Sequence, residues 1–310
     1  MITVLKGKAG HVMPTTEWES GCWVNASAPT AEELETLRAK LPVPSDFFTY
    51  SLDIDERARV EKEDGALLLV LRLPHFQGYS ADIPYTTVPV GIIIAGDLLA
   101  TVCPVENAII QSLAAGEVKD LSTAKKNRFV LQVLHSTAHK YLDYLREINK
   151  IVDKLEDKLQ RSLRNEEVME LLKYQKSLVY FTTGLKSNEL MLSRLQRNHL
   201  FDEHTEDREL LEDVVTEVQQ AIEMTSISEN ILSQMMDAFA SIISNNLNVV
   251  MKFLASMTIV LSLPTIVASI YGMNVELPLG KHPLAFAIVM GLSLLMSILV
   301  AVIFWKKDWF

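Results

Sequence analysis

The pattern of apolar and polar positions divides the chain into three parts with different periodicities. Residues 1–116 contain short apolar runs separated by turn residues, a pattern that favours strands mixed with short helices. From about residue 125, apolar side chains recur every three or four positions, which is the period of a helix with one buried face. Near the end, two long apolar stretches, Val249–Tyr271 and Pro283–Trp305, replace this periodicity.

The first part predicts a small sheet with helices packed beside it. Ala31–Leu41 follows Pro29-Thr30 and has acidic residues in its first turns, as expected of a helix N-terminus. A break at residues 95–97 indicates a hairpin. The predicted strands are Ile2–Leu5, Cys22–Val24, Ala66–Leu73 (closed by Pro74), Thr86–Ile94 and Leu98–Cys103. We therefore expect an α/β domain over residues 1–122.

The middle part predicts long helices. Residues 123–204 form a long antiparallel helical hairpin whose second helix restarts at about residue 166. Thr205 then resembles an N-cap, and no Gly or Pro follows before Pro264. If continuous, residues 205–271 form one helix of roughly 100 Å, at about 1.5 Å per residue, with a slight kink at Pro264.

Each apolar stretch has about 23 residues, close to the roughly 20 that a helix needs to cross a bilayer. The link between them is too short to fold alone, so the two spans form a tight hairpin. Lys252 lies on the same side as Lys306 and Lys307, and the positive-inside rule places that side, with both chain termini, in the cytoplasm. The predicted segments are a cytosolic stalk (205–248), a first span (249–274), an outer loop (275–282), a second span (283–305) and a basic tail (306–310).

The first span carries a polar stripe. Four hydroxyl residues are spaced alternately four and three positions apart, and the stripe extends back to Met251 with Asn248 at its edge. Ser256 falls on the opposite side. Hydroxyl residues are common in membrane helices, where they bond their own backbone or help helices pack. However, several copies around an axis would turn a continuous stripe into a polar lumen. The stripe residues are Thr258, Ser262, Thr265 and Ser269.

Charge and composition narrow the function classes. Of the 29 basic and 39 acidic side chains, residues 249–310 hold four and two, which leaves 25 and 37 and a net charge of −12 for residues 1–248. Such an acidic body argues against binding to nucleic acid. No phosphate loop, nucleophile elbow or paired-cysteine site is visible, so neither an enzyme nor a nucleotide-binding protein is indicated. The two cysteines suit a reducing cytosol, and the seven histidines show no ligand spacing.

The first span ends in Tyr271-Gly272-Met273-Asn274, about 36 residues before the C-terminus. With the helical stalk and the short acidic loop that follows, this motif resembles the CorA-type magnesium channels. The resemblance implies an α/β cytosolic domain, long helices that descend to the cell (inner) membrane, and a homo-oligomer, taken to be a pentamer. It also implies Mg²⁺ as the transported and regulatory ion, no other cofactor, and flux driven by the membrane potential.

The resemblance also implies site residues. Gly272, Met273 and Asn274 would form the selectivity filter, in which amide oxygens of Asn274 hold a hydrated ion without stripping its waters. Glu276 would attract cations to the mouth. Gly272 is expected to leave the helix with a positive φ. The bland alternative for this motif is an ordinary helix stop, with Asn274 in a left-handed conformation.

Asp213 occupies the position of a stalk acid that binds a regulatory ion between subunits in the family. For its partner on the neighbouring subunit the sequence offers Asp53 or Asp55. Two pore positions depart from the family pattern, with Ser262 in place of a Met and Ser269 in place of a Gly. These differences concern the position of the gate more than the function.

Two other functions stay open at this point. The same fold could transport Co²⁺, Ni²⁺ or Zn²⁺, although the stripe lacks the Cys and His ligands that these ions prefer. A membrane-anchored scaffold would need the hairpin only as an anchor, and an anchor has no use for a polar stripe that ends at Asn274.

Overall fold

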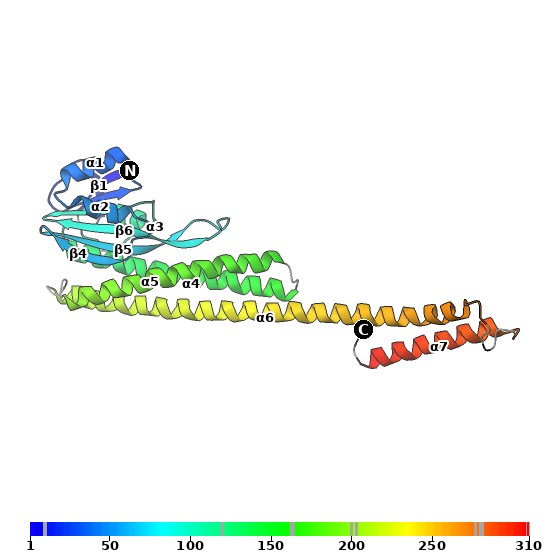
Figure 1. The fold of residues 1–310 in the computed structure, drawn as a ribbon. Coiled ribbons are helices and arrows are strands. Elements are labelled where there is room, and N and C mark those ends of the chain that lie inside the picture. The colour runs from blue at the N-terminus through cyan, green and yellow to red at the C-terminus, as the bar shows by residue number, and fades with distance from the viewer. Residues whose placement is uncertain are drawn as a thin grey trace. The chain divides into compact units, whose positions relative to one another are not determined.

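The computed structural model describes most of the chain and divides it into two compact units, residues 1–234 and 235–310. The fold of each unit is drawn in Figure 1. The described residues are 1–8, 11–118, 121–161, 165–198, 201, 204–275, 278, 282–307 and 309.

The first unit contains one seven-stranded mixed sheet, in the order β2-β1-β3-β7-β6-β5-β4. Neighbouring strands are antiparallel except for β3 and β7, which are parallel. The predicted hairpin is confirmed, with Ala95 opposite Leu98. The strands are β1 (Ile2–Lys8), β2 (His11–Thr15), β3 (Cys22–Ser27), β4 (Arg59–Glu63), β5 (Ala66–Phe76), β6 (Tyr85–Ala95) and β7 (Leu98–Cys103).

One prediction about the sheet was wrong, because β5 does not stop at Pro74 but continues to Phe76. Strand β4 pairs only with the part of β5 from Ala66 to Val70. Beyond Val70 that side of β5 is an edge, where a residue without an N–H group is tolerated. The strands β2 and β4 were not predicted, since both are short and carry few apolar residues.

Helices α1 and α2 cover one face of the sheet, and a core of large side chains lies between these helices and the sheet. Helix α1 (Ala31–Lys40) confirms the predicted helix start after Thr30, and it begins with a complete capping box between Thr30 and Glu33. Helix α2 (Ser45–Leu52) places Phe47 and Phe48 in the core. It packs so closely on β6 that a Cβ atom at Gly91 would lie 1.7 Å from Ser51 Oγ. Helix α3 (Ala108–Ala114) follows β7.

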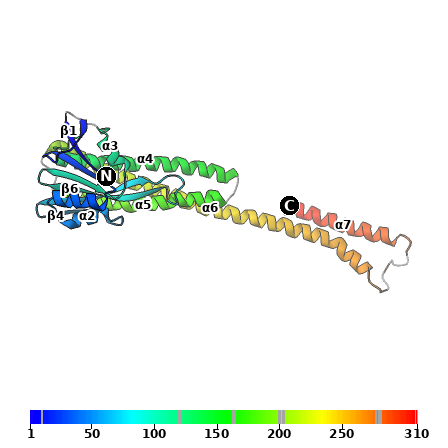
Figure 2. The ribbon, with the colours of Figure 1, turned by 90° about the horizontal axis from the view of Figure 1, so that it is seen from above.

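Long helices cover the other face. Helix α4 (Lys126–Arg161) and helix α5 (Asn165–Arg197) confirm the predicted helical hairpin. The ring of Phe129 on α4 lies 4.9 Å from that of Trp23 in the sheet. The first turns of α6 (Thr205–Tyr271) run alongside α4 and α5 in both views (Figures 1 and 2). Polar contacts join α6 to these helices, among them Arg128–Asp207 at 3.1 Å, Asn149–Ser228 at 2.7 Å and Thr182–Glu229 at 2.9 Å.

Helix α6 has the predicted bounds and 67 residues, and it includes Pro264. Its C-terminal part belongs to the second unit, where α7 (Ala285–Lys306) runs back beside it (Figures 1 and 2). Both helices contain a stretch long and apolar enough to cross a membrane. The predicted membrane hairpin is therefore present as two adjacent helices.

Candidate functional site

The polar stripe of α6 is on the surface of the second unit. Thr258, Thr265 and Ser269 are exposed, and Ser262 is half-buried. The hydroxyls of Thr258 and Thr265 donate to the carbonyl oxygens four residues earlier, at 2.8 and 3.2 Å, and Ser262 donates to Ile259 at 2.9 Å. Each hydroxyl proton is thus held by the helix itself. The oxygen lone pairs remain directed away from the backbone and can accept hydrogen bonds from water.

The opposite face of α6 is covered. Ser256 is completely buried, and Val260, Leu263, Pro264 and Val267 on the same side are half-buried. On α7 the matching buried positions are small: Ser293 is 2% and Ser297 is 8% exposed. Small residues at facing positions let two helix backbones approach closely. These faces mark the contact between α6 and α7.

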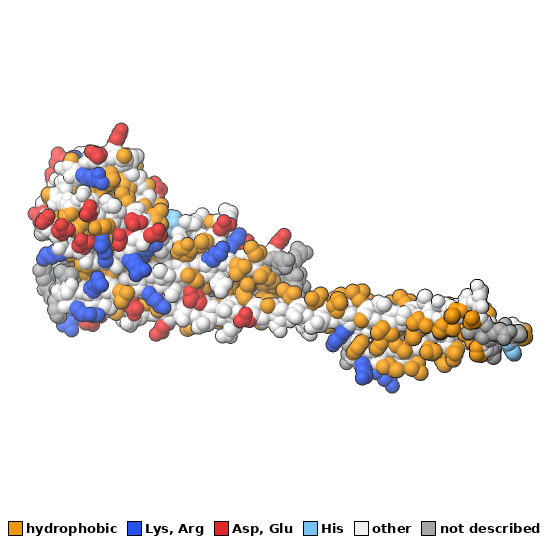
Figure 3. Space-filling view, viewed as in Figure 1, with side chains coloured by type: hydrophobic (Ala, Val, Ile, Leu, Met, Phe, Trp, Pro, Cys, Tyr) orange, Lys and Arg blue, Asp and Glu red, His pale blue; other side chains and the backbone are white. Residues whose placement is uncertain are grey.

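Most of the remaining surface of this unit's two apolar stretches is formed by hydrophobic side chains. Large hydrophobic residues on both helices are exposed, among them Phe253, Leu261 and Leu295. Figure 3 shows hydrophobic side chains over most of this region, with a few basic side chains at one end, whereas the acidic side chains gather over the first unit. An apolar belt of this extent is what a lipid environment requires. The predicted stripe residues Asn248 and Met251, at the start of the apolar stretch, are also exposed.

Helix α6 ends in a short turn whose hydrogen bonds are partly of the 3₁₀ type, to the residue three positions earlier. The N–H of Gly272 donates to Ala268 O at 2.9 Å and to Ser269 O at 3.2 Å, and that of Met273 donates to Ile270 O at 3.2 Å. Asn274 then follows as an exposed residue. Glu276, assigned to cation attraction, lies outside the described residues, as does most of the outer loop.

The expectation of a positive φ at Gly272 was wrong. The described glycines with positive φ do not include Gly272, and Asn274 is not among the other residues with positive φ. Hydrogen bonds to the residue three positions earlier end the helix, and none of the described residues there is in the left-handed conformation. A Cβ atom at Gly272 would meet Ala268 O at 3.4 Å and Ser269 O at 3.5 Å, which is close to ordinary contact. The ordinary left-handed helix stop is therefore also not what this segment forms.

Comparison with known proteins decides the family. The sequence profile described as CorA-like Mg²⁺ transporter protein matches residues 18–307. The chain belongs to this family. It is therefore a membrane protein of a transporter family, with two candidate C-terminal spans.

Relatives of the family cover nearly the whole chain. The cobalt/magnesium transport protein CorA of Methanocaldococcus jannaschii is 30% identical over 297 residues, or 93% of this chain and 90% of that protein. The magnesium transport protein CorA of Helicobacter pylori is 24% identical over 301 residues, again 93% and 90% of the two chains.

Solved structures agree. The complete structure of the CorA magnesium transporter from M. jannaschii matches with a TM-score of 0.86 at 27% identity, covering 100% of this chain and 99% of that one. The full-length CmaX protein matches with a TM-score of 0.70 at 16% identity, over 97% of both chains, and shows the fold alone. The predicted fold class is confirmed, with an N-terminal α/β domain, long helices and two C-terminal apolar spans.

The acids predicted to form a regulatory site lie on two different elements of the first unit. Asp213 is exposed on α6, and Asp53 and Asp55 are exposed in the loop between α2 and β4. Asp53 Oδ1 already accepts the N–H of Asp55 at 3.0 Å. No described contact within the chain joins Asp213 to either of these residues.

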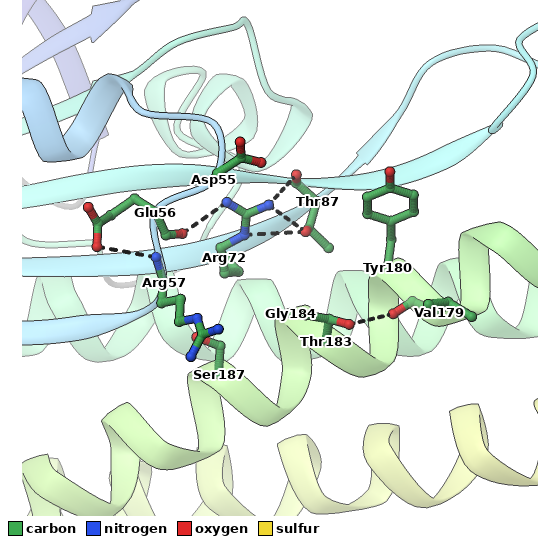
Figure 4. Close-up of a pocket in the computed structure, with 10 residues that line it drawn as sticks. All are labelled: Asp55, Glu56, Arg57, Arg72, Thr87, Val179, Tyr180, Thr183, Gly184 and Ser187. Atoms are coloured by element: carbon green, nitrogen blue, oxygen red, sulfur yellow. Dashed lines mark hydrogen bonds between the residues drawn. The ribbon is translucent and has the colours of Figure 1, made fainter.

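A half-buried arginine holds the loop of Asp53 and Asp55. Arg72 on β5 lies under this loop beside a cavity of about 300 Å³, which α5 closes from below (Figure 4). Its guanidinium donates to the carbonyl oxygens of Ile54 at 2.5 Å, Glu56 at 3.0 Å and Thr87 at 2.7 Å. Burial lowers the pKa of Arg72, and the negative charges of Asp55 and Asp53 oppose this shift after Tyr141. The backbone of this loop is thus held by hydrogen bonds from Arg72, while the Asp53 and Asp55 side chains stay exposed.

Sequence analysis missed one cluster. His135 and His139 lie four residues apart on α4, and both face Glu217 on α6. Histidines at positions i and i+4 share a helix face, and this spacing was a signal available in the sequence. Burial lowers the pKa of His135, with Glu217 as the largest opposing influence and His139 adding to the lowering. Asp213 lies one turn before Glu217 and also acts on His135.

Proposed function

We propose that the chain assembles as a homopentamer in the cell membrane and conducts hydrated Mg²⁺ down its electrochemical gradient. The polar stripe of α6 lines the axis of this assembly, and both termini lie in the cytoplasm. Membership of the CorA-like Mg²⁺ transporter family supports this function, as do the magnesium transport names of the relatives in M. jannaschii and H. pylori.

One observation carries the proposal: the stripe and the buried face of α6 lie on opposite sides of the helix. Helix α7 covers the side of Ser256, so the side of Thr258 and Thr265 is left uncovered in a single chain. Hydroxyls that faced lipid would gain nothing, because lipid offers no partner for their lone pairs. Other copies of α6 around an axis would enclose the stripe in a water-filled lumen, and this arrangement also hides it from lipid.

The lumen would begin at a ring of Asn274 side chains. Mg²⁺ demands octahedral oxygen geometry and loses its waters reluctantly. Amide oxygens accept hydrogen bonds from the waters around the ion, so they can select it without stripping it. A ring of carboxylates would hold a divalent ion too tightly for release. Glu276 just outside would raise the local cation concentration, and Gly272 and Met273 would shape the ring.

Intracellular Mg²⁺ would regulate the pore. The described acids Asp213, Asp53 and Asp55 are exposed, which leaves them available to a neighbouring subunit. An ion that bridges Asp213 to Asp53 or Asp55 of the next copy would relieve repulsion between acidic bodies and favour the closed arrangement. Because Asp53 Oδ1 is already engaged, Asp55 is the better partner.

The filter is tested by flux into proteoliposomes. Removing the amide in Asn274→Ala should lower Mg²⁺ uptake about tenfold or more, since each ring loses all of its side-chain acceptors. Asn246→Ala is the matched control, because Asn246 is exposed on α6 but lies away from the stripe. Both variants are checked for assembly by size-exclusion chromatography. Normal uptake by an assembled Asn274→Ala protein would remove the filter assignment. Uptake of Co²⁺, Ni²⁺ and Zn²⁺ by the unaltered chain decides the ion.

Regulation is tested by limited proteolysis. Digestion of the unaltered protein should slow as Mg²⁺ rises through the millimolar range, about the level that a regulatory site must sense. Asp213→Lys supplies a fixed positive charge in place of the ion, so its digestion should respond less to Mg²⁺. The exposed stalk acid Glu209 offers the control Glu209→Lys. If Asp213→Lys responds as the unaltered protein does, the sensor is another acid.

A further inference from the structure

Three potential metal ligands converge between α4 and α6 in the first unit. His139 Nε2 lies 3.0 Å from Glu217 Oε1, and His135 Nε2 lies 3.5 Å from the same oxygen. The two Nε2 atoms are 3.2 Å apart. Among the residues that the structure describes, this is the group of His, Cys, Asp and Glu whose ligand atoms come together in this way.

The backbone holds this triangle in place. His135 and His139 project from one face of α4, and their rings stand nearly perpendicular with centroids 4.4 Å apart. Polar contacts between α4 and α6 lie on both sides along the helices, Arg128–Asp207 at 3.1 Å and Asn149–Ser228 at 2.7 Å. These contacts fix the register of α6 against α4, so Glu217 is brought to the histidine pair rather than sampling it by chance.

Hydrogen bonding alone leaves the cluster incompletely satisfied. The two Nε2 atoms and Glu217 Oε1 lie within 3.5 Å of one another. An N–H on either histidine Nε2 can be donated to the other Nε2 or to Glu217 Oε1, but not fully to both. The second oxygen, Glu217 Oε2, is buried and has no hydrogen-bond partner within the described part of the chain. A buried carboxylate oxygen without a partner is costly and calls for an explanation.

The dimensions fit a bound ion. A metal about 2.0–2.1 Å from tetrahedral ligands sets the ligand atoms about 3.3–3.4 Å apart. The three observed separations, 3.0, 3.2 and 3.5 Å, bracket this value. Three ligand atoms at these separations can therefore occupy one face of a tetrahedron around an ion, which leaves the fourth position open.

We propose that His135, His139 and Glu217 bind one divalent transition-metal ion of the Zn²⁺ or Co²⁺ type in each subunit. Imidazole nitrogens suit these ions, whereas Mg²⁺ selects oxygen ligands in an octahedron. Water fills the fourth position. The His139 side chain is 52% exposed, and a cavity of about 220 Å³ beside both histidines provides access from solvent.

This site is separate from the conducting pathway and goes beyond the proposed function. It joins α4 to the stalk helix within one chain, and it lies one turn from Asp213. An ion there would fasten the two helices together and would stabilise the first unit in proportion to its affinity. Mg²⁺ would not do this at the same site, because two of the three ligands are nitrogens.

Co²⁺ is the probe for this site, because its visible absorption is intense in a tetrahedral nitrogen-containing site and weak when six oxygens surround it. Added to the full-length protein in detergent, Co²⁺ should give the intense spectrum at one equivalent per chain. A millimolar excess of Mg²⁺ should not remove it. His139→Gln and Glu217→Gln should each weaken binding about tenfold or more, equivalent to roughly 1.4 kcal/mol. The matched control is His204→Gln, which replaces an exposed histidine at the start of α6 and should bind as the unaltered chain does.

Two results would overturn the proposal. One is a weak, six-oxygen spectrum of Co²⁺ with the unaltered protein. The other is an intense spectrum that persists with unchanged affinity in His139→Gln or in Glu217→Gln. The side chains of His139 and Glu217 are 52% and 20% exposed, and Gln is close in size to each, so these substitutions should not prevent folding. Co²⁺ flux through the same variants, reconstituted into proteoliposomes and measured in parallel, separates this site from the pore, because His139→Gln should leave flux intact.

Discussion

In the first unit the completely buried side chains include the largest apolar ones, such as Trp23 and Phe129, whereas beyond residue 240 the buried described residues are three serines. In water, burial of apolar area drives folding, so large side chains go inside. Lipid is as apolar as Leu and provides no such drive, and helices associate through close packing of small residues. Large apolar side chains are therefore buried in the first unit and small residues in the second, as expected for one unit in water and one in lipid. The serines are Ser256, Ser293 and Ser297.

The comparison also separates two kinds of polar residue in the second unit. Ser256 is buried in the contact with α7, while Thr258 two residues later is exposed. Both hydroxyls donate to their own helix. Only burial distinguishes a packing role from one in which the side chain faces a lumen. Ser256 is consequently not a neutral reference for substitutions in the stripe.

The largest effect is expected in the stripe. Thr258→Leu would place a ring of apolar bulk in the lumen and should lower Mg²⁺ flux about tenfold or more, since a hydrophobic constriction can dewet a pore. Gly291→Leu on α7 is the matched control, because a Cβ atom there meets nothing within 4 Å. Flux is measured in proteoliposomes with equal amounts of assembled protein. Equal flux in Thr258→Leu and Gly291→Leu would mean that the stripe faces lipid, and the contrast between the units would then be incomplete.

A smaller effect is expected at the contact between the two membrane helices. Ser293→Leu forces a large side chain into a position that is 2% exposed, and overpacking of this kind costs about 1–3 kcal/mol. The yield of monodisperse protein extracted in detergent should fall several-fold relative to Gly291→Leu, which adds the same side chain on the outer face. If both variants were recovered equally, the small residues would not set the helix spacing.

An effect of similar size, on stability alone, is expected in the first unit. Gly91→Ala brings a Cβ atom against Ser51 Oγ, at 1.7 Å, and Ser51 Cβ, at 2.5 Å, so α2 must shift. We expect a loss of about 1–3 kcal/mol, with each kcal/mol lowering Tm by roughly 2–4 °C in a domain of this size. Thermal unfolding of the full chain measures it. The double variant Ser51→Gly/Gly91→Ala removes the obstructing atoms and should recover part of the loss, and simple additivity of the two changes would argue against the contact.

Much of the architecture could be predicted because it depends on local pattern. The bounds of α6 follow from its N-cap at Thr205 and from the absence of Gly and Pro over the following turns. The membrane spans follow from length and hydropathy, and the strands β5, β6 and β7 from apolar runs between turns. Strand ends depended on neighbours instead, since β5 passes Pro74 only because β4 stops before it.

Within the candidate pore, the sequence alone determined the stripe, because a helix of known period assigns each residue to a face. It also determined the motif of Gly272, Met273 and Asn274 at the end of the helix. Only the tertiary structure decided which face α7 covers, since both faces contain serines and hydropathy does not distinguish them. The backbone conformation at Gly272 was likewise decided by hydrogen bonds of the last turn rather than by residue type.

The cluster of His135, His139 and Glu217 shows the same limit more sharply. The i, i+4 spacing of the histidines is visible in the sequence, but Glu217 lies far along the chain on another helix. Its arrival depends on the register between α4 and α6, which side chains such as Arg128 and Asp207 set through space. Periodicity assigns residues to faces of one helix, and only packing determines which faces of two helices meet.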